Sequence, residues 1–268
     1  MKKLLTLRRC AVLSIAIAAA AALAQQQNWF PSRWGAADEI GAANHLNAGL
    51  VQRAAQLVRT GKVYSLGITV APDTPAFPPR GCKLLVVQPG QVHGQVLGPT
   101  RTTYNDDILE CWVGIGTQLD GLGHIGIDGV YYNGHKGADI APITGLTKLG
   151  VEKVPPIVTR GVLLDMAGLL NTPIVAEGTA FNREQIDAAM RRQNVEIRQG
   201  DVVIFHTGWL SLIGQDNARY GKAEPGLGVE GARYLVSKGV VAVGADTWGW
   251  KPFPSSPAWA CSRCTRNC

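Results

Sequence analysis

Residues 229–245 read Val229-Glu-Gly-Ala-Arg-Tyr-Leu-Val-Ser-Lys-Gly-Val-Val-Ala-Val-Gly-Ala245, and this stretch decides the fold. Its first part, Val229 to Lys238, predicts a helix, and Gly239 is a residue typical of helix ends. The apolar run from Val240 to Ala245 follows at once and predicts a buried strand. A helix that leads directly into a buried strand is typical of α/β proteins.

The same alternation occurs earlier in the chain. Two apolar runs with many β-branched residues, Val162 to Met166 and Val202 to Phe205, predict further buried strands. Between them, Asn182 followed three residues later by Gln185 has the pattern of a capping box, which predicts a helix that runs to about Gln193. We therefore expect a single α/β domain.

The preceding region predicts one helix and one strand. Asn47 is a suitable N-cap for an amphipathic helix that stops at Gly61. The run from Val63 to Val70 predicts a strand. Four prolines then predict an irregular loop. These are Pro72, Pro75, Pro78 and Pro79.

The N-terminal residues have the layout of a secretory signal. Basic residues precede the apolar run from Cys10 to Leu23, and a small-residue cleavage pattern ends at Ala24. The apolar run is shorter than the ~20 residues that a membrane-spanning helix needs. We therefore expect a signal peptide over residues 1–24, a periplasmic or secreted protein, and no membrane attachment after cleavage.

Removal of this signal changes the charge of the chain. The 26 basic and 20 acidic residues become 22 and 20, because Lys2, Lys3, Arg8 and Arg9 are lost, so the formal net charge falls from +6 to +2. No basic stripe interleaved with aromatic residues remains to predict nucleic-acid binding. We expect a small molecule as the partner.

The C-terminal residues differ in character from the rest. Residues 251–268 have no apolar period and contain Cys261, Cys264 and Cys268, which predicts a frameshifted or truncated tail behind a domain of residues 25–250. The pair Cys261 and Cys264 also allows a redox or zinc motif, although no strand and helix frame it. With Cys82 and Cys111 the mature chain has five cysteines, an odd number that does not predict an orderly disulfide framework.

The residues with the clearest chemical potential lie between Gly114 and His124. Gln118 and Asp120 are two residues apart, so in an extended segment both side chains project from the same face. Glycines at 121 and 123 allow a turn that brings His124 back toward Asp120. Such a set can hold a divalent cation, Mn²⁺ or Zn²⁺, and activate water. The alternative is that Asp120 and His124 only hydrogen-bond a glycine-rich turn.

This segment resembles the signature His-x-Gly-Thr-His-x-Asp-x-Pro-x-His of the cyclase family that includes bacterial kynurenine formamidase and isatin hydrolase. Gly116, Thr117, Asp120 and His124 match it. The resemblance extends over most of the chain from residue 34 to about residue 250. It rests on Trp34-Gly35, Asp38-Glu39-Ile40-Gly41, Tyr131-Tyr132-Asn133-Gly134, Gly200-Asp201, His206-Thr207-Gly208-Trp209 and Gly244-Ala245-Asp246-Thr247.

The resemblance implies a fold and a reaction. It implies the swivelling β/β/α arrangement, a homo-oligomer, and metal-dependent hydrolysis of a C–N bond in an amide or cyclic amide, as in an arylformamidase. Asp120 would be a metal ligand, and His124 a ligand and the general acid/base. The first two metal-binding histidines of the family fall on Gly114 and Gln118, of which only Gln118 offers an oxygen.

Other residues are candidates to complete the site. His206 and Asp246 follow strands, where α/β proteins place functional groups, and Glu230 lies near a helix start, where it can instead complement the helix dipole. We expect His206 to orient the substrate or supply a ligand. The alternative to an enzyme is a metal-free relative that binds a small molecule.

Overall fold

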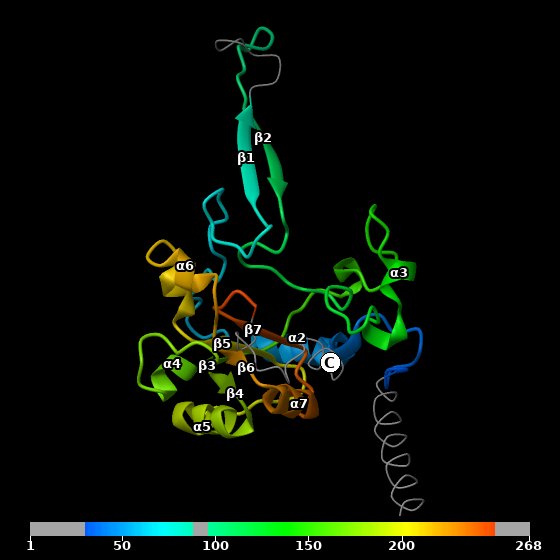
Figure 1. The fold of residues 1–268 in the computed structure, drawn as a ribbon, viewed down its shortest axis with the longest axis vertical. Coiled ribbons are helices and arrows are strands. Elements are labelled where there is room, and N and C mark those ends of the chain that lie inside the picture. Colours follow the sequence, from blue (N-terminus) through cyan, green and yellow to red (C-terminus); the bar gives the residue numbers. More distant parts are fainter. Residues whose placement is uncertain (1–29, 88–95, 250–268) are drawn as a thin grey trace, which may run out of the picture. The chain divides into compact units, whose positions relative to one another are not determined.

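The computed structural model describes residues 30–87 and 96–249, which form two compact units (Figure 1). The first unit contains residues 30–45 and 120–157, and the second contains residues 46–87, 96–119 and 158–249. The predicted signal peptide and the tail of residues 251–268 lie outside the described residues.

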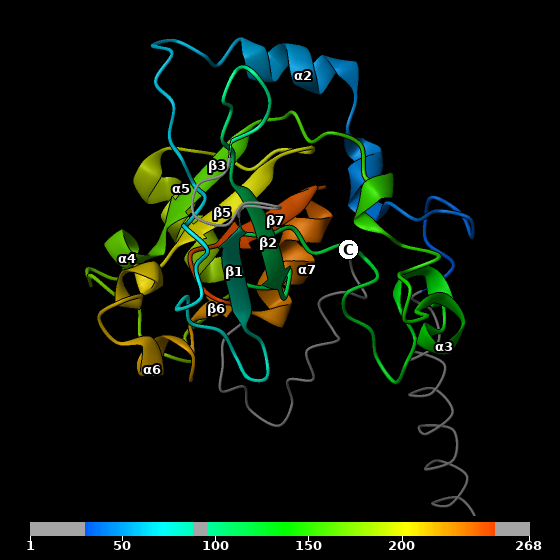
Figure 2. The same cartoon turned by 90° about the horizontal axis from the view of Figure 1, so that it is seen from above.

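The second unit is built on a parallel sheet of three strands. These are β3 (Gly161–Asp165), β5 (Val202–His206) and β7 (Ala242–Ala245), in the order β3-β5-β7, as Figure 2 shows. Alternate residues of the first two strands are buried, as a strand periodicity of two requires. The register pairs Asp165 with His206 where β3 and β5 end. The predicted α/β fold is confirmed.

Two helices lie on the same side of this sheet (Figure 1). The first, α5 (Arg183–Gln193), begins with the predicted capping box, in which the Gln185 side chain accepts a hydrogen bond from the Asn182 amide at 3.0 Å. The second, α7 (Val229–Ser237), ends before Gly239, whose φ of 72° is accessible to glycine at little cost. The predicted starts and ends of both helices are therefore confirmed to within about one residue.

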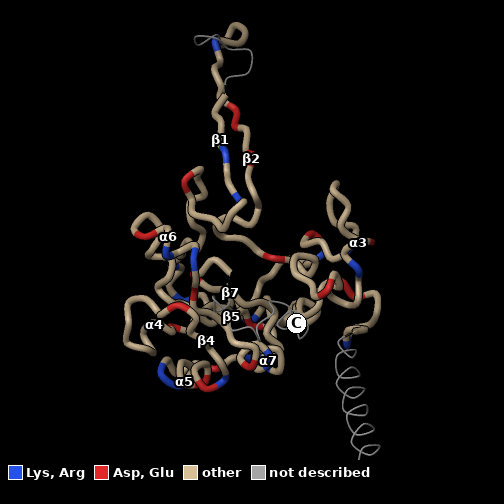
Figure 3. The backbone as a smooth tube through the Cα atoms, viewed as in Figure 1, with Lys and Arg blue, Asp and Glu red and all other residues tan. Residues whose placement is uncertain are grey.

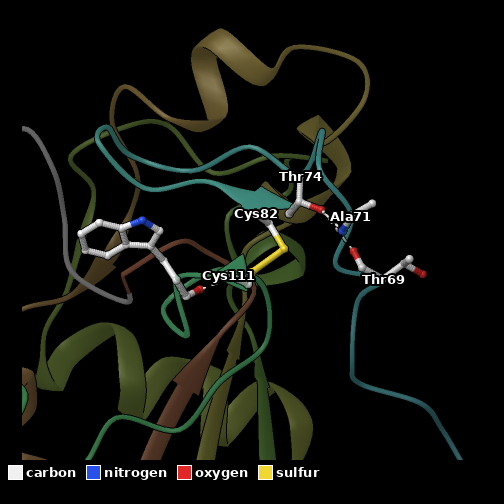
Figure 4. The surroundings of a disulfide bond; sticks show 6 residues. Thr69, Ala71, Thr74, Cys82 and Cys111 are labelled. Carbon is white, nitrogen blue, oxygen red and sulfur yellow. Dashed lines mark hydrogen bonds between the residues drawn. A yellow bond between two sulfur atoms is a disulfide. The ribbon is translucent and has the colours of Figure 1, made fainter. Parts of the chain in front are cut away.

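A hairpin extends from the second unit. Its strands β1 (Cys82–Val87) and β2 (Asp106–Cys111) are antiparallel, and a disulfide joins Cys82 to Cys111 at the end of the ladder (Figure 4). Basic charge lies on β1 and acidic charge on β2 (Figure 3), and Lys83 pairs with Glu110 at 3.2 Å. One disulfide therefore forms among the described residues, and the remaining cysteines lie outside them.

Two predictions for the preceding region need correction. Helix α2 (Ala48–Ala55) begins after Asn47, whose side chain accepts from the Leu50 amide as predicted, but it ends well before Gly61. The predicted strand from Val63 to Val70 is wrong, because residues 63–70 pair with no other strand among the described residues. The Ile68 amide donates instead to the Thr117 hydroxyl at 3.1 Å. A β-branched sequence alone does not supply a partner for a ladder.

The remaining elements are short. The second unit also has the parallel pair β4 (Ala180–Phe181) and β6 (Gly226–Leu227), and the short helices α4 (Met166–Leu169), η4 (Trp209–Leu212) and α6 (Asn217–Tyr220). The first unit has η1 (Gly41–His45), η2 (Tyr132–Gly134), α3 (Gly137–Ile140) and η3 (Val151–Lys153). Within residues 30–87 and 96–249, no helix is long and apolar enough to cross a membrane.

Candidate functional site

Asp120 and His124 face each other across a turn in the first unit. The His124 amide donates to the Gly121 carbonyl oxygen at 3.0 Å, and this turn brings His124 Nε2 to 3.9 Å from Asp120 Oδ2. Both side chains are about half exposed. The approach of the imidazole to the carboxylate, expected from the glycine spacing, is therefore seen, whereas the roles of the two residues stay predictions.

Close packing of the backbone explains the glycine at position 123. A Cβ there would lie 2.6 Å from the Leu146 side chain and 3.2 Å from the Leu149 carbonyl oxygen. A side chain at position 123 would therefore require the Leu146 side chain and the Leu149 backbone to shift. The position of His124 therefore depends on the segment that contains Leu149.

Glu39 holds that segment in place. Its carboxylate accepts from the Leu149 amide at 2.8 Å, and it pairs with Lys148 at 3.0 Å and with Lys153 at 2.7 Å. The hydrogen bond from Lys153, which outweighs the opposing effect of burial, lowers the pKa of Glu39 to about 2. Glu39 thus stabilises, as a charged group, the surface against which the turn of Asp120 and His124 packs.

Asp165 and His206 form a second acid and imidazole pair, in the second unit. His206 Nδ1 donates to Asp165 Oδ1 at 2.9 Å, and both side chains are about half exposed. The hydrogen bond from His206, followed by that from the Gly168 amide, holds the pKa of Asp165 below its usual value. The carboxylate therefore fixes one tautomer of the imidazole and leaves Nε2 available to other groups.

Asp246 follows β7 and is occupied by backbone and hydroxyl donors. Oδ1 accepts from the Thr207 amide at 2.8 Å and from the Thr207 hydroxyl at 2.6 Å, and Oδ2 accepts from the Gly208 amide at 2.8 Å. These bonds fasten the residues that follow β5 to the end of β7. Asp246 thus lies at the strand edge as expected, where it organises the turn that follows His206.

The contacts of Glu230 and Gln118, the other proposed ligands, are with residues outside these two pairs. The Glu230 carboxylate accepts from the Arg183 amide at 2.7 Å and so caps the first turn of α5. Gln118 Oε1 lies 3.7 Å from the point that a Cβ at position 114 would occupy. For Glu230 the observed contact is the structural one of the two alternatives that the sequence allows.

The described residues do not complete a metal site within either unit. Asp120 and His124 supply two donors, and no group of three or more His, Cys, Asp or Glu side chains able to hold an ion occurs among residues 30–87 and 96–249. A zinc ion commonly takes three or four protein ligands. The donor set of these residues is therefore short of what a resident ion requires.

Two residues of these sites were missed by the sequence analysis. Asp165 had a usable signal, because it is the polar residue that ends the apolar run of β3 beside a second strand that ends in His206. Glu39 lies in a stretch that carries the family resemblance, but its role could not be read from the sequence, because its partners Lys148 and Leu149 are more than 100 residues away along the chain.

Comparison with known proteins adds to this geometry. A family profile described as "Putative cyclase" matches residues 64–252. A crystal structure described as a novel cyclase is 26% identical, with a TM-score of 0.74 over 82% of this chain and 75% of the other. Isatin hydrolase A from Ralstonia solanacearum is 21% identical, with a TM-score of 0.58 over 82% of this chain and 80% of the other.

The second of these structures is similar in fold alone at that level of identity. No curated protein matches this chain in sequence. The family profile, in contrast, spans well over half of the chain and includes the segment from Gly114 to His124 and both members of the Asp165 and His206 pair. The chain therefore belongs to the cyclase family described by that profile.

Proposed function

We propose that this protein hydrolyses a C–N bond of an amide or a cyclic amide, in the manner of an arylformamidase. The observation that carries the proposal is the half-exposed pair of Asp120 and His124 at 3.9 Å, in a segment that the family profile covers. A similar fold in a protein described as an isatin hydrolase supports the same reaction class.

His124 is suited to move the protons of this reaction. An imidazole can accept a proton from the attacking water and return one to the departing nitrogen, so that an amide and water give a carboxylate and an amine. His206, held by Asp165, is proposed to orient the substrate or to take part in proton transfer.

We also propose, from the family resemblance, that the protein binds a divalent cation, Mn²⁺ or Zn²⁺. Asp120 and His124 are the proposed ligands. The candidates to complete the ligand set are Gln118, Glu230 and Asp246. When bound, such an ion would polarise the carbonyl group of the substrate. The described residues do not assemble three His, Cys, Asp or Glu donors for such an ion in either unit.

Export and assembly are further parts of the proposal. The disulfide between Cys82 and Cys111 supports a periplasmic or secreted location, because disulfides persist mainly in oxidising compartments. A homo-oligomer is proposed from the family, and light scattering of the mature protein would measure it. No partner other than a small molecule is proposed.

The test is a hydrolysis assay on mature protein stripped of metal and then supplied with Mn²⁺ or Zn²⁺. The substrates are formanilide, as an N-formyl aryl amide, and isatin, as a cyclic amide. We expect turnover of at least one substrate, with a loss of about 100-fold or more in kcat for His124→Ala. Asp139→Asn changes an exposed carboxylate of α3 and serves as the control. If neither substrate is hydrolysed with either ion, the proposal fails.

A second candidate is a metal-free protein that binds a small molecule. It is favoured by Gly114 and Gln118, which stand where the family resemblance implies two histidine ligands. Metal analysis of the mature protein distinguishes the two candidates, because only the hydrolase is proposed to retain Mn²⁺ or Zn²⁺.

A further inference from the structure

Arg80 lies among aromatic and amide groups of the second unit, beside the position of Gly114. Arg80 Nε is 3.7 Å from the point that a Cβ at position 114 would occupy, and Gln118 Oε1 is also 3.7 Å from that point. The guanidinium carbon of Arg80 lies 5.7 Å from the centre of the Trp248 ring. We refer to Phe77, Arg80, Gly114, Gln118 and Trp248 as the Arg80 cluster.

A tight turn fixes the start of the Arg80 side chain. The Arg80 amide donates to the Phe77 carbonyl oxygen at 3.2 Å, which closes the turn Phe77-Pro-Pro-Arg80. The two prolines restrict the backbone of this turn before any ligand binds. Phe77 and Arg80 are therefore presented together at low entropic cost.

Trp248 provides a fixed aromatic surface for the cluster. Its ring packs against the buried residues Trp209, Leu212 and Tyr220, and its centre lies 5.2 Å from that of the Phe77 ring. The contact of Arg80 with the ring face is a cation–π interaction, which holds the guanidinium without neutralising its charge. The cluster thus combines a cation with two aromatic rings.

The charge of Arg80 is available to a ligand. The side chain is half buried, and no carboxylate in the described part of the chain forms an ion pair with it. Arg160, which is also partly buried, differs from Arg80 because it is paired with the buried carboxylate of Asp201. A partly desolvated guanidinium attracts an anion more strongly than an arginine in free solvent does.

From this arrangement we infer that the Arg80 cluster binds the carboxylate of a small aromatic acid. The guanidinium provides two parallel N–H donors for the carboxylate, and Phe77 and Trp248 provide apolar surface for the ring. Gln118 adds a further hydrogen-bonding group, with Oε1 3.7 Å from the point that a Cβ at Gly114 would occupy.

This inference rests on the proposed function. Hydrolysis of a cyclic aryl amide, or of an aryl amide that carries an acid group, leaves an aromatic carboxylate as the product. The inference assigns the carboxylate of such an acid to Arg80 and its ring to Phe77 and Trp248. Binding itself can be measured without turnover, so a failure of the hydrolase proposal and a failure of this inference give different results.

The experiment compares benzoate with benzamide, a neutral compound of nearly the same shape, by isothermal titration calorimetry on the mature protein. We expect benzoate to bind the wild type at least about 10-fold more tightly than benzamide, and Arg80→Gln to remove that preference. Arg59→Gln is the matched control, since it removes an exposed arginine of the same unit, and it should leave the preference unchanged.

Two further variants separate charge from geometry and from stacking. Arg80→Lys keeps the charge but loses the planar fork, so benzoate should bind with an affinity between those of the wild type and Arg80→Gln. Phe77→Leu should weaken benzoate and benzamide alike. Equal binding of the two compounds to the wild type, or an undiminished preference in Arg80→Gln, would overturn the inference.

Discussion

His206 Nδ1 and Asp165 Oδ1 lie 2.9 Å apart at the ends of two adjacent parallel strands. The register of β3 and β5 places these residues opposite each other, so the pair follows from the sheet itself. Asp165 also accepts from the Gly168 amide at 2.9 Å and caps α4. The Asp165 carboxylate thus caps α4 and also accepts the hydrogen bond of the His206 imidazole.

Replacement of Asp165 by Asn should separate its role as a helix cap from its role as the partner of His206. Asn is also a good N-cap, so the melting temperature should change little, whereas the charge that holds His206 is lost. We expect the Nδ1–H tautomer of His206 to lose its dominance in ¹⁵N NMR spectra, and kcat to fall by about 10-fold with little change in KM.

The matched control for this variant is Asp216→Asn. Asp216 caps α6 by accepting from the Arg219 amide at 3.0 Å. It should alter neither the His206 spectrum nor kcat. An unchanged His206 tautomer in Asp165→Asn would show that the carboxylate does not position the imidazole.

Glu39→Gln should destabilise the protein at neutral pH, because two lysines and a backbone amide contact the Glu39 carboxylate. The pKa of Glu39 is lowered from 4.5 to about 2, so its contribution is present above pH 4.5 and is lost as the pH falls toward 2. Urea unfolding should show a loss of about 1 kcal/mol at pH 7 and a smaller difference from the wild type near pH 2.

The control is Glu110→Gln, which removes the exposed ion pair with Lys83. Exposed pairs contribute little, so its unfolding curve should overlay that of the wild type. A Glu39→Gln curve that differs equally from the wild type at pH 7 and near pH 2 would contradict the assigned role of the Glu39 charge.

Loss of the disulfide should loosen the hairpin. Cys82 and Cys111 are 29 residues apart, for which chain-entropy arguments give a stabilisation of about 3 to 4 kcal/mol. We expect the double variant Cys82→Ser with Cys111→Ser to exchange amide hydrogens faster over β1 and β2 and to keep the protection of β3 and β5. Lys83→Gln, in the same hairpin, should exchange as the wild type does. Unchanged exchange in the double variant would refute the stabilising role.

Restoring histidines at positions 114 and 118 should strengthen metal binding. A Cβ at Gly114 would meet Arg80 and Gln118 only at 3.7 Å, an ordinary contact distance, so the backbone leaves room for a Cβ. We expect Gly114→His with Gln118→His to bind Mn²⁺ or Zn²⁺ at least about 10-fold more tightly than the wild type in calorimetry. The pair Gly114→Ala with Gln118→Ala should give no gain, and an equal gain in both would refute the role of the imidazoles.

The sequence predicted the elements whose boundaries are set by local chemistry. The capping box at Asn182, the helix end at Gly239 and the apolar runs of β3, β5 and β7 act within a few residues, and each was found. The strand predicted over residues 63–70 failed because a strand requires a partner, and the Thr117 hydroxyl meets the Ile68 amide instead.

The sites were predicted in the same uneven way. The approach of His124 to Asp120 is short-range and followed from two glycines. The pairing of Asp165 with His206, the support from Glu39 and the proximity of Arg80 to Gly114 join residues 34 to 110 positions apart. Such contacts depend on tertiary packing, which no local pattern encodes.

Gly114 and Gly208 differ in what constrains them. Gly208 has a φ of 76°, and a Cβ there would collide with the Pro173 carbonyl oxygen, so folding itself demands glycine. At Gly114 neither the backbone nor the neighbours exclude a side chain. A substitution at position 114 therefore requires no compensating change in the fold. Related chains can gain or lose a functional side chain at this position by a single substitution.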